Sequence, residues 1–290
     1  MYKRQALDYI RQLSKIAFTN DKITIIVIDD PHLLEAVSLV KDKLKCQVEL
    51  IFSFHGFNLL LDPKIISSID KILWLSKLGS EKSKSKYQYF PESYVVGNAI
   101  DSKIFYPLDK EGYMAARTAK GYRDTDEVLI WMANDRPKKG FHIFKSVVEN
   151  LLEINKNLKV IIIGSFQKIN HDRVQSIGKI PNNKVANYLQ IGNYYMFTTL
   201  YEEGFGLSVV EALKCGNIVM ASNKGALPEV LEGLKHSYLI DKPEDVYSWI
   251  KCFNFIKKNS PFNRENISKN YTDTIWNYQD WEQKFMKAIG

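Results

Sequence analysis

Residues 202–231 read EEGFGLSVVEALKCGNIVMASNKGALPEVL, and this stretch is the most informative in the chain. Two carboxylates, Glu203 and Glu211, lie on either side of a Gly-Phe-Gly turn. The apolar run that opens on Ser208 predicts a helix, which Gly216 would end as its C-terminal cap. Free backbone N–H groups at a helix N-terminus suit a phosphate, and a nearby carboxylate suits sugar or ribose hydroxyls. The pattern therefore predicts a nucleotide-sugar pocket.

Ser208 and Glu211 also allow a purely structural interpretation. They fit a capping box, in which Glu211 only satisfies the backbone N–H of Ser208. The longer pattern favours function, because the stretch resembles the signature EGFGLxxxEAxxxGxPVVAxxxGGxPE of retaining glycosyltransferases with the GT-B fold, the glycogen-synthase-like group often called family 4. The matching positions are Glu203, Gly204, Phe205, Gly206, Leu207, Glu211, Ala212, Gly216, Val219, Ala221, Gly225, Pro228 and Glu229.

The resemblance implies a role for each acid. Glu211 would bind the ribose hydroxyls of the donor. Glu203 would lie near the sugar ring, where a carboxylate can orient the donor and stabilise developing positive charge. The backbone amides of Gly204–Leu207 would contribute to the phosphate site. Glu202 is expected to be an exposed neighbour.

A second cluster of candidate residues follows the strand expected at 128–132. Transfer from a nucleotide diphosphate leaves negative charge on the phosphate, which without a metal must be balanced by cationic side chains and N–H dipoles. Lys139 and Arg136 in ANDRPKKG (residues 133–140) are the candidates, and their position after a buried strand favours function over a plain basic turn. This segment resembles the family's GRxxxxKG, although Asn134 stands where the family has arginine.

Weaker resemblances follow the family's order along most of the chain. Residues 94–101 (YVVGNAID) resemble VIPNGVD, and residues 174–189 resemble GxVxxxxxxxYL. His55 ends an apolar strand and precedes a glycine, like the family's strand-end histidine, so it would contact the donor sugar or its leaving phosphate. A structural role for this histidine stays open. Gly164 would allow the nucleotide to approach the backbone closely.

Apolar, β-branched runs alternate with helical periodicity, which is typical of α/β proteins with parallel sheets. The expected strands are 23–28, 48–53, 72–75, 94–96, 128–132, 160–163, 195–198, 218–221 and 238–240. We expect two doubly wound, Rossmann-like domains, residues 1–106 and 107–290, because the polar stretch 108–126 connects two strand–helix series. The resemblance implies that they face each other across a cleft. It also implies that the first domain is shortened, by one or two units of roughly 30 residues.

The composition is that of a globular protein, with 45% hydrophobic and 25% charged residues among 290. No apolar run approaches the roughly 18 residues of a membrane span, and the N-terminus does not look like a secretory signal. Three scattered cysteines form neither a metal pattern nor an even disulfide set, so we expect a reducing, cytoplasmic setting. The formal charge of +7 favours anionic partners, including an acidic membrane face, but no nucleic-acid-binding motif is found.

Two charged motifs receive a structural interpretation. Asp124-Thr125-Asp126 is a formal DxD, the metal-binding motif of GT-A glycosyltransferases, but it precedes a strand and is expected to be solvated loop acids. Residues 82–86 (KSKSK) are expected to form a soluble loop that could also face an anionic acceptor or membrane. We therefore predict no metal site and no cofactor.

The leading hypothesis is a retaining, metal-independent glycosyltransferase that moves a hexose-type sugar from a UDP or GDP donor. The acceptor would be a surface glycan or a lipid-linked saccharide, as in lipopolysaccharide or capsule biosynthesis, and the enzyme could lie peripherally at the inner membrane face. It could act as a homo-oligomer or with a partner subunit. The alternative is a catalytically degenerate binding subunit, which the shortened first domain and Asn134 favour. A dinucleotide oxidoreductase lacks support, since no GxGxxG follows an early strand.

Overall fold

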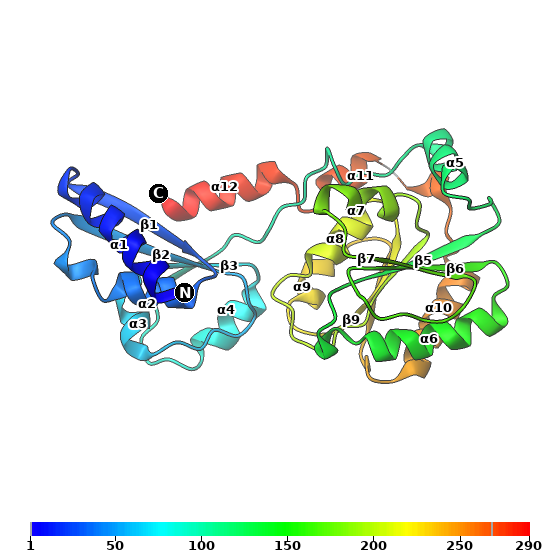
Figure 1. Cartoon of the computed structure of the whole chain (residues 1–290), viewed down its shortest axis with the longest axis horizontal. Helices are drawn as coiled ribbons and strands as arrows, with labels where there is room; N and C mark the ends of the chain where they lie inside the picture. The colour runs from blue at the N-terminus through cyan, green and yellow to red at the C-terminus, as the bar shows by residue number, and fades with distance from the viewer. Residues whose placement is uncertain (1, 268) are drawn as a thin grey trace. The chain divides into compact units, whose positions relative to one another are not determined.

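The computed structural model describes residues 2–267 and 269–290, which form two compact α/β units (Figure 1). The first unit takes the chain up to Gly97 together with Trp281–Gly290, and the second takes Asn98–Asp280. Each unit is built on one sheet, and every strand pairing in both sheets is parallel. Two parallel-sheet α/β domains are the architecture that the sequence predicted.

The first unit contains a four-stranded sheet in the order β1-β2-β3-β4. Its strands are β1 (Lys22–Ile28), β2 (Gln47–Phe54), β3 (Lys71–Trp74) and β4 (Glu92–Val95). Its helices are α1 (Tyr2–Phe18), α2 (Pro31–Ser38), α3 (Pro63–Ser68), α4 (Lys77–Lys84) and most of α12 (Tyr278–Ile289), with the 3-10 turn η1 (Lys41–Lys43). Helix α2 begins at Pro31, and the Asp30 side chain accepts hydrogen bonds from the N–H groups of His32 and Leu33.

The end of the chain belongs to the first unit, unlike the predicted division into residues 1–106 and 107–290. Ala288 of α12 is fully buried against Ile51, Leu73 and Val96, which face one side of the first sheet. Helices α1, α2 and α3 cover the opposite side. The apolar stripe of α12 therefore completes the core of the first unit, a long-range contact that local patterns do not reveal.

The second unit contains a six-stranded sheet in the order β10-β9-β8-β5-β6-β7. Its strands are β5 (Glu127–Met132), β6 (Leu158–Ile163), β7 (Val174–Gly178), β8 (Tyr194–Phe197), β9 (Ile218–Ser222) and β10 (Ser237–Ile240). Its helices are α5 (Lys110–Ala119), α6 (Phe141–Ile154), α7 (Asn182–Leu189), α8 (Leu207–Lys214), α9 (Leu227–Leu231), α10 (Val246–Asn259) and α11 (Lys269–Thr274), with the 3-10 turns η2 (Pro137–Lys139) and η3 (Arg264–Asn266).

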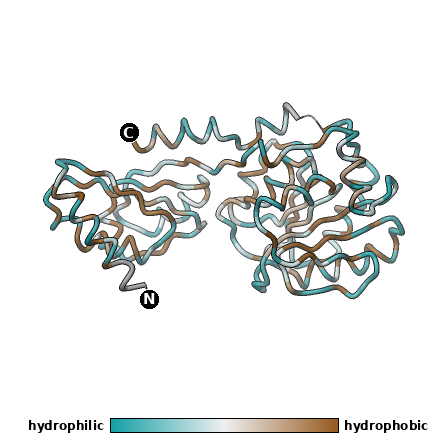
Figure 2. The backbone as a smooth tube through the Cα atoms, turned by 45° about the horizontal axis from the view of Figure 1, so that its top comes forward, coloured by the Kyte–Doolittle hydropathy of each residue, from teal (hydrophilic) through white to brown (hydrophobic). Residues whose placement is uncertain are grey.

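The core of the second unit explains the continuous apolar runs in its sequence. Strands β5 and β6 are buried almost throughout, and α6 and α10 pack together against one face of the sheet. In Figure 2 these strands are coloured as hydrophobic along most of their length. Because β8, β5 and β6 are neighbours and parallel, their carboxyl ends meet at one edge of the sheet.

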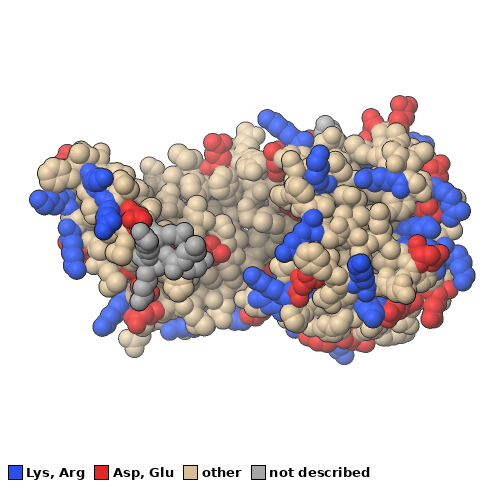
Figure 3. Space-filling model, in the orientation of Figure 1, with Lys and Arg blue, Asp and Glu red and all other residues tan. Residues whose placement is uncertain are grey.

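The surface of the protein carries many charged side chains. No helix among the described residues has both the length and the apolar character needed to cross a bilayer. On the face shown in Figure 3, basic and acidic side chains are interspersed over the second unit. The residues 82–86, predicted to be a loop, instead begin within the last turn of α4, where the Lys82 ammonium lies 5.4 Å from the centre of the Phe57 ring.

Candidate functional site

The signature stretch forms the loop after β8 and the helix α8, at the carboxyl edge of the second sheet. Helix α8 begins at Leu207, and its N-cap is Gly206, whose φ of 89° is left-handed and whose lack of a side chain leaves the helix uncapped. A Cβ on Gly206 would lie 2.5 Å from a methyl group of Leu227, so a larger residue would clash there. The capping-box interpretation is wrong, because Ser208 lies inside the helix and cannot be its N-cap. The first N–H groups of α8 therefore lack a side-chain acceptor.

Glu203 is held next to Lys139 at this edge. Its Oε1 lies 2.7 Å from the Lys139 Nζ and accepts a hydrogen bond of 2.6 Å from the Thr199 hydroxyl. The Glu203 side chain is only 12% exposed and the Lys139 side chain 17%. The second oxygen, Oε2, makes no hydrogen bond with any described residue. One oxygen of Glu203 is thus fixed by the protein, and the other is available to a ligand.

Backbone contacts bring Lys139 to Glu203. The Leu200 N–H donates to the Lys138 carbonyl over 2.8 Å, and the Thr198 hydroxyl donates to the Gly140 carbonyl over 3.0 Å. Gly140 is left-handed, with a φ of 71°, and a Cβ there would lie 1.8 Å from the Thr198 carbonyl oxygen. The close approach requires glycine. The glycine after Lys139 in the PKKG sequence therefore lets the two loops after β5 and β8 join.

Gly225 plays a similar part on the other side of Glu203. Its φ is 61°, and a Cβ would lie 2.4 Å from the Glu203 backbone nitrogen. The next residue, Ala226, donates its N–H to the Glu203 carbonyl over 2.8 Å. The glycine of the signature's second half thus fixes the backbone that carries the acid of its first half.

Glu211 is buried without a partner. It is 8% exposed, lies in the second turn of α8 and makes no side-chain hydrogen bond or ion pair with any described residue. Burial raises the pKa of its carboxyl from 4.5 to about 7. A buried, unpaired carboxylate is unfavourable to folding, so such groups are usually retained for binding or catalysis.

Only the backbone of Phe205 is available to a ligand. Its side chain is 3% exposed, and its ring packs edge-on against Trp276, with the ring centres 4.8 Å apart. The Trp276 indole N–H donates to the Val230 carbonyl over 3.0 Å. Leu207, in contrast, is 43% exposed at the start of α8. The aromatic position of the motif therefore anchors the loop in the core of the second unit.

Arg136 and Asn134 are exposed in the loop after β5. The Asn134 side-chain oxygen accepts a hydrogen bond of 3.2 Å from the Arg136 N–H, so this asparagine shapes the turn. The Arg136 guanidinium makes no hydrogen bond or ion pair with the described residues. An unpaired cation thus lies in the same loop as Lys139, two positions after the place where the family carries arginine.

Asp135, between these two residues, was missed by the sequence analysis. Its carboxylate accepts a hydrogen bond of 3.0 Å from the Phe166 N–H and a short one from the hydroxyl of the buried Ser165. The bond from Ser165 lowers the pKa of Asp135 most, against the effect of burial. Asp135 therefore joins the loops after β5 and β6. An acid three positions after a strand was a signal, but its partner 30 positions later was not visible in the sequence.

Gly164 and His55 occupy the expected strand ends. Gly164 follows β6 with a φ of 86°, and a Cβ there would lie 2.7 Å from the Ala133 carbonyl oxygen, so strand packing alone requires glycine. Its approach to a nucleotide stays a prediction. His55 follows β2 in the first unit, donates its N–H to Asp29 Oδ1 over 3.0 Å, and places its Nε2 3.2 Å from the Ser53 hydroxyl. A role in the reaction is likewise untested.

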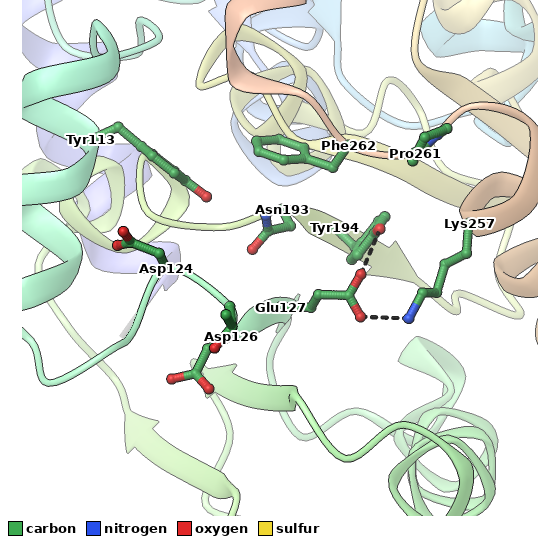
Figure 4. A pocket seen from close by; sticks show the side chains of 10 residues that line it. Tyr113, Asp124, Asp126, Glu127, Asn193, Tyr194, Lys257, Pro261 and Phe262 are labelled. Atoms are coloured by element: carbon green, nitrogen blue, oxygen red, sulfur yellow. Dashed lines mark hydrogen bonds and ion pairs between the residues drawn. The ribbon is translucent and has the colours of Figure 1, made fainter.

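The DxD motif lies at the opposite, amino edge of the second sheet (Figure 4). Asp126 is not solvated as predicted. It is 3% exposed and pairs with Arg123 over 2.9 Å, because the turn before β5 folds it inward. A pocket of about 220 Å³ lies here, lined by Tyr113, Asp124, Thr125, Asp126, Glu127, Asn193, Tyr194, Lys257, Pro261 and Phe262. Within the described part of the chain, no cluster of three or more His, Cys, Asp or Glu residues could hold a metal ion.

Comparison with known families decides how these features are classified. The model of the family described as Glycosyl transferases group 1 matches residues 115–273, which is more than half of the chain. The chain belongs to this family. The match includes Arg136, Lys139, Glu203 and Glu211, so these candidate residues lie within the matched domain.

Two curated relatives of this glycosyltransferase domain are named for phosphatidylinositol lipids. The GPI3 subunit of phosphatidylinositol N-acetylglucosaminyltransferase from Saccharomyces cerevisiae is 26% identical over 199 residues, covering 62% of this chain and 43% of the relative. A phosphatidyl-myo-inositol mannosyltransferase from Propionibacterium freudenreichii is 28% identical over 178 residues, covering 59% and 44%. The chain thus spans less than half the length of these relatives.

Solved structures share the fold along nearly the whole chain. Sucrose-phosphate synthase from Thermosynechococcus elongatus superimposes with a TM-score of 0.77 at 13% identity, covering 98% of this chain and 77% of that protein. Anabaena HepE, solved with UDP and glucose, superimposes with a TM-score of 0.77 at 14% identity. The superposition covers 97% of this chain and 80% of HepE. The chain therefore has the GT-B fold.

Proposed function

We propose that this protein is a retaining glycosyltransferase that uses a UDP- or GDP-sugar without a metal or cofactor. The observation that carries the proposal is Glu211, a carboxylate that is 8% exposed and has no partner among the described residues. Two vicinal ribose hydroxyls would supply the hydrogen-bond donors that this carboxylate lacks. Their binding would repay the desolvation that raises its pKa to about 7.

The diphosphate would lie between the start of α8 and the loop after β5. The uncapped N–H groups of α8 offer dipoles, and Arg136 and Lys139 offer positive charge. These groups would stabilise the negative charge that develops on the leaving phosphate, which is the work that a metal performs in other glycosyltransferases. Addition of a chelator should therefore leave activity unchanged.

The transfer step follows from these positions. The bond between the anomeric carbon and the phosphate oxygen breaks, and its electron pair leaves with the nucleoside diphosphate. The acceptor hydroxyl forms the new bond on the same face of the sugar, and its proton passes to the departing phosphate oxygen. The free Oε2 of Glu203 would orient the sugar and stabilise the positive charge of its ring.

The acceptor is proposed to be lipid-linked. The names of the yeast and bacterial relatives both specify phosphatidylinositol lipids, which favours an inositol phospholipid or a lipid-linked saccharide. Such an acceptor would bring the protein to a membrane surface. The narrower prediction of lipopolysaccharide or capsule synthesis gains no support from these relatives.

A ligand panel tests the proposal. UDP, GDP, ADP and NAD are compared by thermal shift, where a ligand at 100 times its dissociation constant adds about 2.7 kcal/mol to the stability. The preferred nucleotide's glucose, N-acetylglucosamine and mannose conjugates are then incubated with phosphatidylinositol vesicles, and the anomeric configuration of the product is determined. Binding of neither UDP nor GDP would refute the proposal, and an inverted product would refute retention.

A second candidate is a binding subunit that acts with a partner. The relatives from yeast, human and Arabidopsis are each named as a subunit of phosphatidylinositol N-acetylglucosaminyltransferase. This chain alone would then bind the donor nucleotide but neither hydrolyse nor transfer its sugar. Donor turnover by the purified chain separates the two candidates, since turnover is expected only for a complete enzyme.

A further inference from the structure

We propose that Phe166 is the platform on which the donor's nucleobase stacks, which makes it a specificity-determining residue of the site. The inference rests on the proposed function, because it assumes that a nucleoside diphosphate binds the second unit. It adds a residue that lies outside the signature stretch and outside the candidates found from the sequence.

The strand order places the loop of Phe166 next to the loop that carries the phosphate-binding candidates. Glu211 belongs to α8, which follows β8, and the phosphate-binding candidates follow β5. Moving along the sheet from β8 past β5, the next strands are β6 and β7, and Phe166 follows β6.

Phe166 is exposed, yet its backbone is fixed. Its side chain is 70% exposed, whereas Ser165 before it is 1% exposed. The Phe166 N–H donates to both oxygens of Asp135, over 3.0 and 3.3 Å, and the Ser165 hydroxyl binds the same carboxylate. A large ring on a rigid loop is open to water at the carboxyl edge of the sheet, where ligands of such folds bind.

A cation accompanies the ring. The Lys179 ammonium lies 5.5 Å from the centre of the Phe166 ring and comes from the residue after β7. The two neighbouring loops are tied by a hydrogen bond of 2.8 Å from the Gly164 N–H to the Gly178 carbonyl. Aromatic rings and cations together are the groups on which bases stack, and every base offers a π-face to them. A nucleobase is the part of a donor that matches this chemistry.

Substitution of Phe166 tests the inference on the full chain by titration calorimetry with UDP and GDP. Phe166→Leu keeps an apolar side chain but removes the π-face. It should weaken binding of whichever nucleotide the wild type binds more tightly by about five- to 150-fold, the loss expected for one base–aromatic stack. Phe166→Trp restores a π-face and should bind at least as tightly as the wild type. Tyr247→Leu is the matched control, because Tyr247 is 69% exposed on α10 of the same unit.

Each outcome decides the matter. A nucleotide affinity of Phe166→Leu equal to that of the wild type would overturn the inference and leave the proposed function intact. Equal weakening in the leucine and tryptophan variants would also overturn it, because the effect would then not depend on the π-face. If the wild type binds neither UDP nor GDP, the proposed function fails and the inference fails with it.

Discussion

The two edges of the second sheet both carry charged side chains, but they differ in how these are paired. At the amino edge, Asp126 pairs with Arg123 over 2.9 Å. Glu127 pairs there with Lys257 over 2.6 Å (Figure 4). At the carboxyl edge, Glu203 also pairs with Lys139, over 2.7 Å, but Glu211 is buried with no partner among the described residues. Charge alone would have marked both edges as candidate sites. The buried Glu211 carboxylate without a partner is what distinguishes the ligand site from the structural edge.

Lys214 refines this comparison within one helix. It lies three positions after Glu211 and is fully buried, and burial lowers its pKa to about 8. Its Nζ, however, donates to the carbonyls of Thr272 and Ile275 over 2.8 and 2.9 Å. A shifted pKa therefore accompanies burial in both residues, and only Glu211 combines it with an unmet need for hydrogen bonds.

The largest effect is expected from Glu203→Gln at the carboxyl edge. The amide carries no charge to stabilise the sugar or to hold Lys139, so transfer should fall at least about 100-fold. Nucleotide binding should be nearly unchanged, because Glu203 is assigned to the sugar. The rate of sugar transfer and, by calorimetry, the nucleotide affinity are measured on the same preparation. Glu202→Gln is the control, and equal losses in the two variants would contradict the assignment.

Glu211→Gln is expected to increase the free energy of unfolding at neutral and higher pH. The folded pKa of about 7 exceeds the ordinary 4.5, so the folded state binds this proton more tightly and the wild type loses stability as pH rises through that window. The loss is complete above pH 7 and absent below 4.5. The variant should be more stable at pH 8 by about 3 kcal/mol, and its advantage should vanish by about pH 4.5. Urea unfolding at both pH values checks this, and a destabilised variant at pH 8 would contradict it.

Asp126→Asn at the amino edge should instead lower the free energy of unfolding at neutral pH. Burial opposes ionisation of Asp126, but hydrogen bonds from Arg123 outweigh it and lower the pKa. The stabilising contribution is therefore present above the unfolded pKa and is lost as pH falls through the lower folded one. The variant should lose about 1–3 kcal/mol at neutral pH. Nucleotide affinity should stay unchanged, and a weakened affinity in a folded variant would erase the distinction between the two edges.

The smallest effect is expected from Glu127→Gln. The side chains of Glu127 and Lys257 are 25% and 31% exposed, and such ion pairs contribute at most about 1 kcal/mol. Chemical denaturation should detect a small loss of stability, with transfer activity retained. A large loss of activity would mean that the pocket of Figure 4 takes part in the reaction.

Much of the fold could be predicted because parallel sheets bury continuous apolar runs. The strand β7 was missed, since its residues are polar or only partly buried at the sheet edge. The start of α8 was placed on Ser208 and not on Leu207, because its N-cap is the left-handed Gly206, which has no side chain to mark the helix start. The return of α12 to the first unit depends on a core that forms between distant segments.

The sequence identified several residues of the candidate site but not which of them contact each other. The sequence suggested that Glu203, Glu211 and Lys139 act together, and the structure brings Glu203 and Lys139 into contact. The sequence could not reveal that Glu211 lacks a partner, that Asp126 has one, or that Asp135 holds the backbone of Phe166. These properties depend on distances between loops of different strands, which local patterns do not encode.

The affinity of the Glu211→Gln variant for UDP and GDP tests the central claim most directly. Two charge-assisted hydrogen bonds to ribose hydroxyls would be weakened, so calorimetry should show a dissociation constant about ten- to a hundredfold above that of the wild type. Asp126→Asn, measured alongside, should bind like the wild type. Wild-type affinity in the Glu211 variant would mean that its unpaired carboxylate does not hold the donor.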